Sequence, residues 1–307
     1  MKVVSVINYK GGVGKTTVTA NLAAYAASQG KRVLMIDLDP QTNLTFSFMS
    51  VPEWKSYAEK GKTLKDFFYP IIMGHSNSVP LSSLIIPLSS LEKETGVKLD
   101  IICSSLELID IDINLSSTIT GPTPPILAAN FLKGHSHLRN GLMSLSDNYD
   151  LVLIDCPPNF YTVVKNAITA SDYYIVPARM DFLSTLGIEQ LDKNAVEYVT
   201  QYNTFILQLN DGSFKSLFTT MLGVVPTMLT IQNKQPVKVA VPFINQVKEN
   251  YYLFPHLRYS TTLFGDIPPQ GIPVVLSRPN LKSIVTWKTV QSELKALGDD
   301  FIKKVGC

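Results

Sequence analysis

The sequence predicts an α/β protein with a doubly wound, mostly parallel sheet, and three observations favour this fold. Apolar runs rich in β-branched residues alternate with segments of helical periodicity, which is the pattern of βαβ units. A glycine-rich turn, KGGVGKTT (residues 10–17), follows the first apolar run and opens the first helical segment. Acidic residues end two further apolar runs, RVLMID (32–37) and LVLID (151–155).

The expected elements follow from these patterns in chain order. Strands are expected where short β-branched or aliphatic runs occur, at 2–8, 32–37, 97–105, 149–158, 172–178 and 217–225. Helices are expected where apolar residues recur every three or four positions, at 16–29, 124–146, 185–200 and 279–305. The segment 40–97 has a less regular pattern, and 208–216 is expected to be a turn-rich insertion.

Composition narrows the class of protein. The chain has 307 residues, of which 45% are hydrophobic and 17% charged, so we expect a well-packed globular protein. It contains no repeat and no long Pro/Gly/Ser linker, which predicts a single domain over 1–307. A net charge of +2 is too small to indicate nucleic-acid binding by itself. The three cysteines are scattered and odd in number, which favours the reducing cytoplasm.

The glycine-rich turn predicts a triphosphate site. Glycines allow successive backbone N–H groups to converge on phosphates, and the following helix directs its positive end at them. Lys15 would reach the β- and γ-phosphates, and the Thr16 hydroxyl would bind Mg²⁺. The usual G-x-x-x-x-G-K-[ST] pattern has a glycine where Tyr9 stands here. The residues expected to bind the nucleotide are Lys10, Gly11, Gly12, Val13, Gly14, Lys15, Thr16 and Thr17.

Acidic residues are expected beside this turn. Asp37 and Asp39 are two positions apart at the tip of a strand, so both side chains point the same way. Ligands of open parallel sheets lie at the carboxyl ends of the strands, which places this pair near the phosphates. Asp155, at the end of another apolar strand, suits a carboxylate that supports Mg²⁺ through water.

These motifs, in this order and spacing, resemble the deviant Walker A P-loop ATPases of the ParA/MinD group. The resemblance continues in DYYIVPARMDFLSTLGIEQL (172–191) and MLGVVPTM (221–228), so it covers most of the chain. It is closest to ParA-type, Soj-like partition ATPases, with no helix-turn-helix expected ahead of the first strand. It implies a single ParA-like ATPase domain that uses ATP and Mg²⁺ and hydrolyses ATP slowly, stimulated by a partner.

The resemblance also implies roles for individual residues. Family members bind ATP as a face-to-face homodimer, in which the lysine matching Lys10 reaches the partner's nucleotide. Lys10, Lys15 and Asp39 are therefore the expected catalytic residues, with Asp39 positioning the attacking water. Thr16, Asp37 and Asp155 are expected to support Mg²⁺. The segment HLRYSTTLFGDIPPQGIPV (256–274) matches poorly the family's region near adenine, so no adenine contact is assigned.

The charge pattern suggests which molecules this expected ATPase binds. Between residues 217 and 298 there are eight basic and three acidic residues. The basic ones are Lys234, Lys238, Lys248, Arg258, Arg278, Lys282, Lys288 and Lys295; the acidic ones are Glu249, Asp266 and Glu293. This excess suits binding to phosphate backbones without base readout. With the resemblance, it implies nonspecific DNA, a ParB-like centromere-binding or adaptor protein, and a cytoplasmic, nucleoid-associated location.

Two alternatives share the same ATP site. A MinD-like membrane-cycling ATPase would need a free amphipathic helix at the C-terminus. The apolar stripe there (Val290, Leu294, Leu297, Phe301 and Val305) is opposed by Asp299 and Asp300, which an anionic membrane repels, so we expect a packed helix and no stable membrane insertion. A ParA-like positioning ATPase for a protein cargo would have the same motifs as a DNA partition ATPase.

Overall fold

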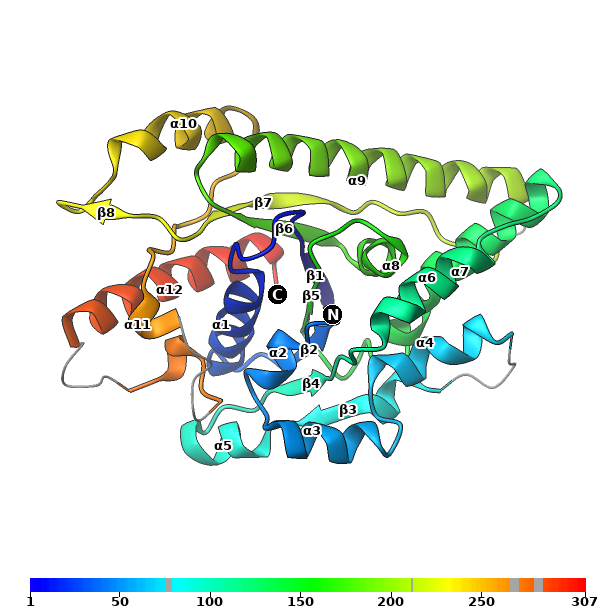
Figure 1. The fold of residues 1–307 in the computed structure, drawn as a ribbon, viewed down its shortest axis with the longest axis horizontal. Coiled ribbons are helices and arrows are strands. Elements are labelled where there is room, and N and C mark those ends of the chain that lie inside the picture. The colour runs from blue at the N-terminus through cyan, green and yellow to red at the C-terminus, as the bar shows by residue number, and fades with distance from the viewer. Residues whose placement is uncertain (75–78, 211, 265–270, 279–283) are drawn as a thin grey trace.

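The computed structural model describes residues 1–74, 79–210, 212–264, 271–278 and 284–307. Within these residues, seven strands form the main sheet in the order β3-β4-β2-β5-β1-β6-β7 (Figure 1). They are β1 (Lys2–Val6), β2 (Val33–Asp37), β3 (Ile85–Pro87), β4 (Asp100–Ile102), β5 (Leu151–Asp155), β6 (Tyr173–Ala178) and β7 (Thr220–Pro226). All neighbouring pairs are parallel except β3 and β4. The predicted mostly parallel α/β fold is confirmed.

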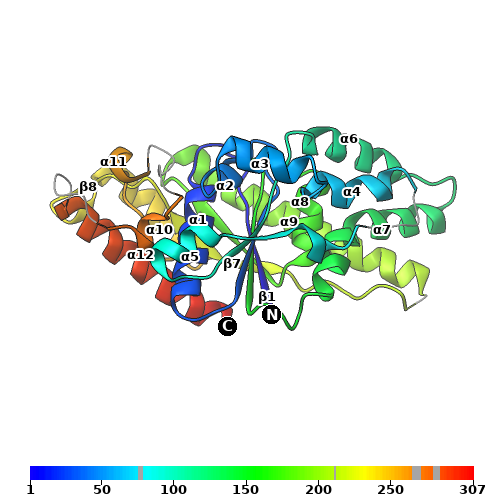
Figure 2. The ribbon, with the colours of Figure 1, turned by 90° about the horizontal axis from the view of Figure 1, so that it is seen from below.

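Helices cover both faces of this sheet (Figure 2). One face carries α1 (Lys15–Ser28), α2 (Asn43–Phe46), α5 (Ser89–Thr95) and α12 (Ile284–Val305), and the other carries α4 (Leu64–Ile72), α6 (Leu108–Thr118), α7 (Pro124–Met143), α8 (Thr162–Ala170) and α9 (Phe182–Leu209). The remaining elements are α3 (Val51–Ala58), η1 (Leu81–Leu84), β8 (Ile231–Gln232), β9 (Gln235–Pro236), η2 (Lys238–Ala240), α10 (Val241–Asn250), α11 (Thr261–Phe264) and η3 (Val274–Leu276). Each helical layer buries its own apolar core against the sheet.

The sheet brings the sequence motifs together at its carboxyl edge, where the parallel strands end. β5 lies between β1 and β2, with Asp155 in register with Val6 on one side and Asp37 on the other. Because all three strands run in the same direction, the glycine-rich turn after β1 emerges beside both carboxylates. In that turn Gly12 and Gly14 have φ angles of 67° and 85°, in the left-handed region that favours glycine. The chain can therefore turn sharply into α1.

Several boundaries differ from the sequence predictions. The segment 40–97 is regular: it contains α2, α3, α4, η1, β3 and α5. These elements are short, so none spans enough turns to show a clear periodicity. Helix α6 was not predicted, α9 is longer than the expected 185–200, and the strand expected at 97–105 is only β4. The expected insertion begins inside α9, which ends at Leu209 with Asn210 in a left-handed conformation.

The predicted packed helix at the C-terminus is confirmed. The five residues of the apolar stripe on α12 are all buried, at 2% exposure or less. Helix α12 packs on α1, where the Tyr25 hydroxyl donates a hydrogen bond to Asp299. Residues 279–283 of the expected helix lie outside the described residues. None of the helices in the described ranges is long and apolar enough to cross a membrane.

The contact between α1 and α12 depends on Gly298, and this generates a prediction. A Cβ atom at Gly298 would lie 2.1 Å from Cδ1 of Tyr25, which is itself buried. We expect Gly298→Ala to lower the free energy of unfolding by about 1–3 kcal/mol, because the two helices must separate. Chemical denaturation followed by circular dichroism measures this change.

Gly187→Ala on α9 is the matched control. A Cβ there meets no atom within 4 Å, so the same substitution should stabilise the protein by about 0.5–1 kcal/mol through helix propensity alone. Equal effects of the two substitutions would show that Gly298 has no special packing role.

Candidate nucleotide-binding site

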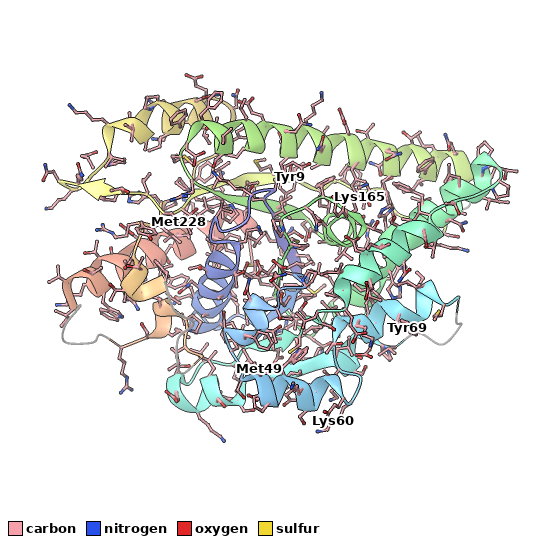
Figure 3. The ribbon with its side chains drawn as sticks, in the orientation of Figure 1. Tyr9, Met49, Lys60, Tyr69, Lys165 and Met228 are labelled. Carbon is pink, nitrogen blue, oxygen red and sulfur yellow. The ribbon has the colours of Figure 1, made fainter. Side chains whose placement is uncertain are left out.

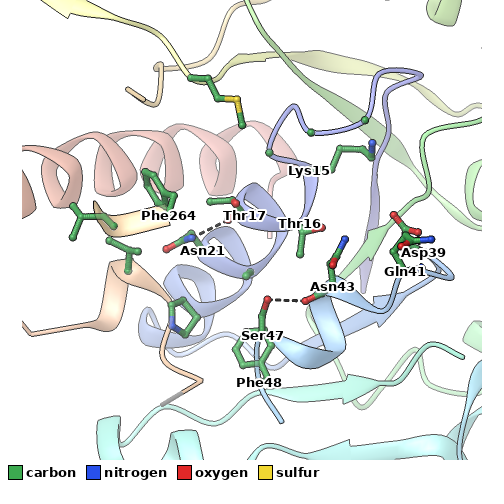
Figure 4. Close-up of a pocket in the computed structure, with 18 of the residues that line it drawn as sticks. Lys15, Thr16, Thr17, Asn21, Asp39, Gln41, Asn43, Ser47, Phe48 and Phe264 are labelled. Atoms are coloured by element: carbon green, nitrogen blue, oxygen red, sulfur yellow. Dashed lines mark hydrogen bonds between the residues drawn. The ribbon is translucent and has the colours of Figure 1, made fainter. Parts of the chain in front are cut away.

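A cavity of about 420 Å³ opens at the carboxyl edge of the sheet, over the start of α1 (Figure 4). Polar groups gather at one end of it, and apolar side chains line the other. The polar end includes six predicted residues: Gly11, Gly12, Gly14, Lys15, Thr16 and Thr17. Asp39 and Gln41 lie at this end as well, on the opposite wall from α1. The predicted phosphate loop therefore forms part of the wall of this cavity.

Lys15 lies at the base of this polar end. Its side chain is buried, and Nζ donates to the carbonyl oxygens of Asn8 at 3.3 Å and Lys10 at 3.2 Å. Burial lowers the pKa of the Lys15 ammonium from its ordinary value, while the charges of Asp155 and Asp39 act in the opposite direction. The two carbonyls hold a cation that would otherwise be costly to bury, so the ammonium is positioned in advance of any anion.

Asp155 connects β5 to the start of α1. Its two oxygens accept hydrogen bonds from the Thr16 hydroxyl at 2.7 Å and the Thr19 hydroxyl at 3.2 Å. Burial raises the pKa of Asp155 to about 7, although the bond from Thr16 and the charge of Lys15 lower it. A cation that approached this buried carboxyl would stabilise its ionised form.

Asp37 and Asp39 take different positions, although they are two residues apart. Asp37 is fully buried, and its oxygens accept from the backbone N–H and the hydroxyl of Thr45 and from the N–H of Asp39. Burial raises the pKa of Asp37 well above its ordinary value, and the charge of Asp155 adds to this effect. Asp39 instead lines the cavity, and Oδ1 accepts from the N–H of Gln41 at 2.9 Å. Asp37 therefore shapes the loop that presents Asp39.

The donor set at this edge fits Mg²⁺. Among the described residues no group of three or more His, Cys, Asp or Glu side chains could hold a metal ion by itself. Magnesium usually takes one or two protein ligands and completes its shell with phosphates and water. The Thr16 hydroxyl at the cavity wall, with the buried Asp155 carboxylate directly behind it, meets that requirement.

Two of the eight residues predicted to bind the nucleotide do not line the cavity. Val13 is buried, and its carbonyl oxygen accepts from the Thr227 hydroxyl. Its side chain therefore does not face the cavity, and it contributes to the loop through its backbone. The Lys10 side chain is 39% exposed and does not line the cavity; its Nζ is 3.2 Å from Asp181 Oδ2. Of the two lysines in the loop, Lys15 serves the cavity of its own chain and Lys10 points outside it.

The apolar end of the cavity was not predicted. It is formed by Met228, Leu263, Phe264, Pro273 and Val274. Four of these belong to the segment 256–274, to which sequence comparison assigned no contact. Short motifs carry no signal here, because an apolar wall of a cavity requires a surface rather than a particular residue. The described residues of this segment that line the cavity reach it because the chain returns to α1 after β7.

Comparisons with known proteins agree with this geometry. The family described as an AAA domain matches residues 1–208. Over 97% of this chain and 99% of the relative, the chain is 28% identical to the sporulation initiation inhibitor protein Soj of Bacillus subtilis. It is 31% identical to the chromosome partitioning protein ParA of Caulobacter vibrioides, over 62% of this chain and 61% of the relative.

Solved structures show the same fold. An ATP complex of a Cyanothece McdA variant superposes with a TM-score of 0.69 at 20% identity, covering 100% of this chain and 96% of that chain. A plasmid partition protein from Borrelia burgdorferi bound to AMPPNP superposes with a TM-score of 0.62 at 22% identity, covering 99% and 98%. Together with the phosphate loop and the acidic strand ends, these matches place the chain in the AAA domain family, among the ParA- and Soj-like P-loop ATPases.

Proposed function

We propose that this protein is an ATPase that dimerises on binding ATP, binds DNA without sequence preference, and partitions a plasmid or chromosome with a ParB-like centromere-binding partner. The observation that carries the proposal is the separation of the two loop lysines. Lys15 is buried at the cavity, whereas Lys10 lies outside it and is partly exposed. A second chain facing this edge would meet the Lys10 side chain.

The residues of the cavity would divide the work of hydrolysis. The loop backbone and Lys15 would hold the phosphates, and Asp39 would orient the attacking water. Thr16 and Asp155 would hold Mg²⁺, which neutralises phosphate charge when bound. The apolar end would accept the base. Asp37 is proposed to support Mg²⁺ indirectly, because its oxygens are already occupied by Thr45 and the Asp39 N–H.

The proposed DNA surface lies at one end of the molecule, where Figures 1 and 2 both show β8, α10, α11 and α12 together. Lys234, Lys238, Lys248 and Lys288 are exposed there. Arg258 is not part of this surface, because its guanidinium pairs with Glu293 at 2.7 Å. Lys282 and Asp266 lie outside the described residues.

The first prediction from this proposal concerns turnover. Asp39→Ala should leave ATP binding nearly unchanged and slow phosphate release by at least about a hundredfold, because the phosphate cradle stays intact while the water loses its orienting carboxylate. Nucleotide titration and a phosphate-release assay measure the two effects. Asp147→Ala, an exposed aspartate before β5, is the control. Wild-type turnover in Asp39→Ala would contradict the role assigned to Asp39.

The second prediction separates the two lysines. Lys15→Ala should weaken ATP binding by a single chain, because Lys15 belongs to its own cavity. Lys10→Ala should spare that binding and abolish ATP-induced dimerisation. Light scattering on an Asp39→Ala background, where turnover is blocked, is the decisive measurement. A double variant that dimerises as well as Asp39→Ala alone would exclude a contact in trans.

The third prediction concerns DNA. Binding should require ATP, tolerate any sequence and fall steeply with salt. Replacing Lys234 and Lys288 together by alanine should weaken it and reduce its salt dependence, because two phosphate contacts are lost. The control replaces Lys133 and Lys193, exposed on α7 and α9. Gel shifts across a salt series test this, and equal loss in both double variants would argue against the proposed surface.

A further inference from the structure

The side chain of Lys10 is held by the first turn of α9. Its Nζ lies 3.2 Å from Asp181 Oδ2 and 3.5 Å from Oδ1, and it donates to the Ser184 hydroxyl at 3.3 Å. These residues are more than 170 positions away in the sequence, so the contact is a product of the fold. The lysine proposed to act on a partner's nucleotide is therefore paired with an acid of its own chain.

Asp181 is fixed in place by a second bond. It is the N-cap residue of α9, where Oδ1 accepts from the Ser184 N–H at 2.8 Å. An N-cap carboxylate is stabilised by the positive end of its helix, so it is a rigid counter-ion rather than a mobile surface acid. The position of Lys10 is thus determined by the position of α9.

The residue before Lys10 is bound to the same helix. The Tyr9 hydroxyl accepts a hydrogen bond from Asn194 on α9, and its ring meets Phe160 edge-on, with the centroids 6.1 Å apart. Figure 3 places Tyr9 beneath α9. The Lys10 N–H donates to the Asn8 side chain at 2.9 Å. The Lys10 carbonyl accepts from Lys15 Nζ at 3.2 Å. Since both the N–H and the carbonyl of Lys10 are hydrogen-bonded, the Lys10 side chain is the part that can move.

The pair has the exposure expected of a reversible contact. The Lys10 and Asp181 side chains are 39% and 43% exposed. Water and salt reach such a pair, so the ion pair favours the joined over the separated side chains by only about five-fold or less. A doubly or triply charged phosphate chain offers Lys10 a stronger partner than one carboxylate, so the contact can be exchanged at modest cost.

We propose that Asp181 is a positioning residue that holds Lys10 on its own chain and competes with a partner's nucleotide for it. This inference rests on the proposed trans role of Lys10. Closing the dimer then requires two such pairs to break, one in each chain. The competition opposes association until both nucleotides are in place, which raises the ATP requirement for dimerisation.

The experiment uses Asp181→Asn, which removes the charge and keeps a good N-cap residue. The first readout is the rate at which an amine-reactive reagent labels Lys10 in the protein without nucleotide, followed by mass spectrometry, with the exposed Lys133 as internal reference. The second is the dimer dissociation constant with ATP, measured by light scattering on the Asp39→Ala background. Asp66→Asn, on the first turn of α4, is the control for charge loss at a helix start.

Two results are expected. Labelling of Lys10 should become about two- to five-fold faster in Asp181→Asn than in the wild type. Added salt should reduce this difference in labelling rate, because a partly exposed ion pair is screened. The dimer dissociation constant should fall by about two- to twenty-fold, since two pairs are released per dimer. Asp181→Glu, which restores the carboxylate, should recover part of both effects, and Asp66→Asn should change neither.

Failure of this inference is distinguishable from failure of the proposed function. Unchanged labelling of Lys10 in Asp181→Asn would overturn the pairing itself, whatever the protein does with ATP. Faster labelling with an unchanged or weaker dimer would overturn the competition. If the Lys10→Ala variant dimerises normally, the trans role is wrong; the labelling result then still decides whether Asp181 holds the lysine.

Discussion

The hydrogen bonds from Thr16 and Thr19 to Asp155 are the interaction on which the rest of the site depends. They connect the start of α1 to the end of the central strand β5, and so set where the phosphate loop between β1 and α1 must end. The same bonds hold a carboxyl in a buried position, where its negative charge is costly. A structure that keeps such a group is prepared to receive a cation, and Lys15 with its two carbonyl contacts is prepared to receive an anion.

A second layer of contacts sets the loop opposite α1. Asp37 accepts from the backbone N–H and the hydroxyl of Thr45, and the Ser104 hydroxyl donates to the carbonyl of Asp39 at 2.7 Å. These bonds present the Asp39 carboxylate to the cavity while Asp37 remains behind it. The two acids at this strand tip thus take separate positions: Asp37 shapes the loop and Asp39 faces the cavity. The pattern of alternating side chains alone predicted that both would point the same way, toward the phosphates.

Helix α9 joins this site to the helices on its own face of the sheet. It binds Lys10 through Asp181, binds Tyr9 through Asn194, and contributes Tyr198 to the aromatic core with Phe131 and Phe160. Tyr9 occupies the position of the usual first glycine of the loop. Its contacts with α9 and Phe160 account for an aromatic residue there, since the ring and the hydroxyl both find partners at the margin of the core.

The sequence by itself determined the parallel sheet, the phosphate loop and the acidic strand ends, because these depend on local periodicity and on residue types at short spacing. The phosphate loop can be recognised within one turn of chain, from the glycines at positions 12 and 14 and the pair Lys15 and Thr16. The short elements between residues 40 and 97, the apolar end of the cavity and the pairing of Lys10 with Asp181 were decided only by the tertiary structure. The elements between 40 and 97 are too short to show a periodicity, and the other two features require segments that are far apart in the sequence to meet. Phe264 reaches the cavity, and Asp181 reaches Lys10, only because burial of both faces of the sheet brings the later helices back over the carboxyl edge.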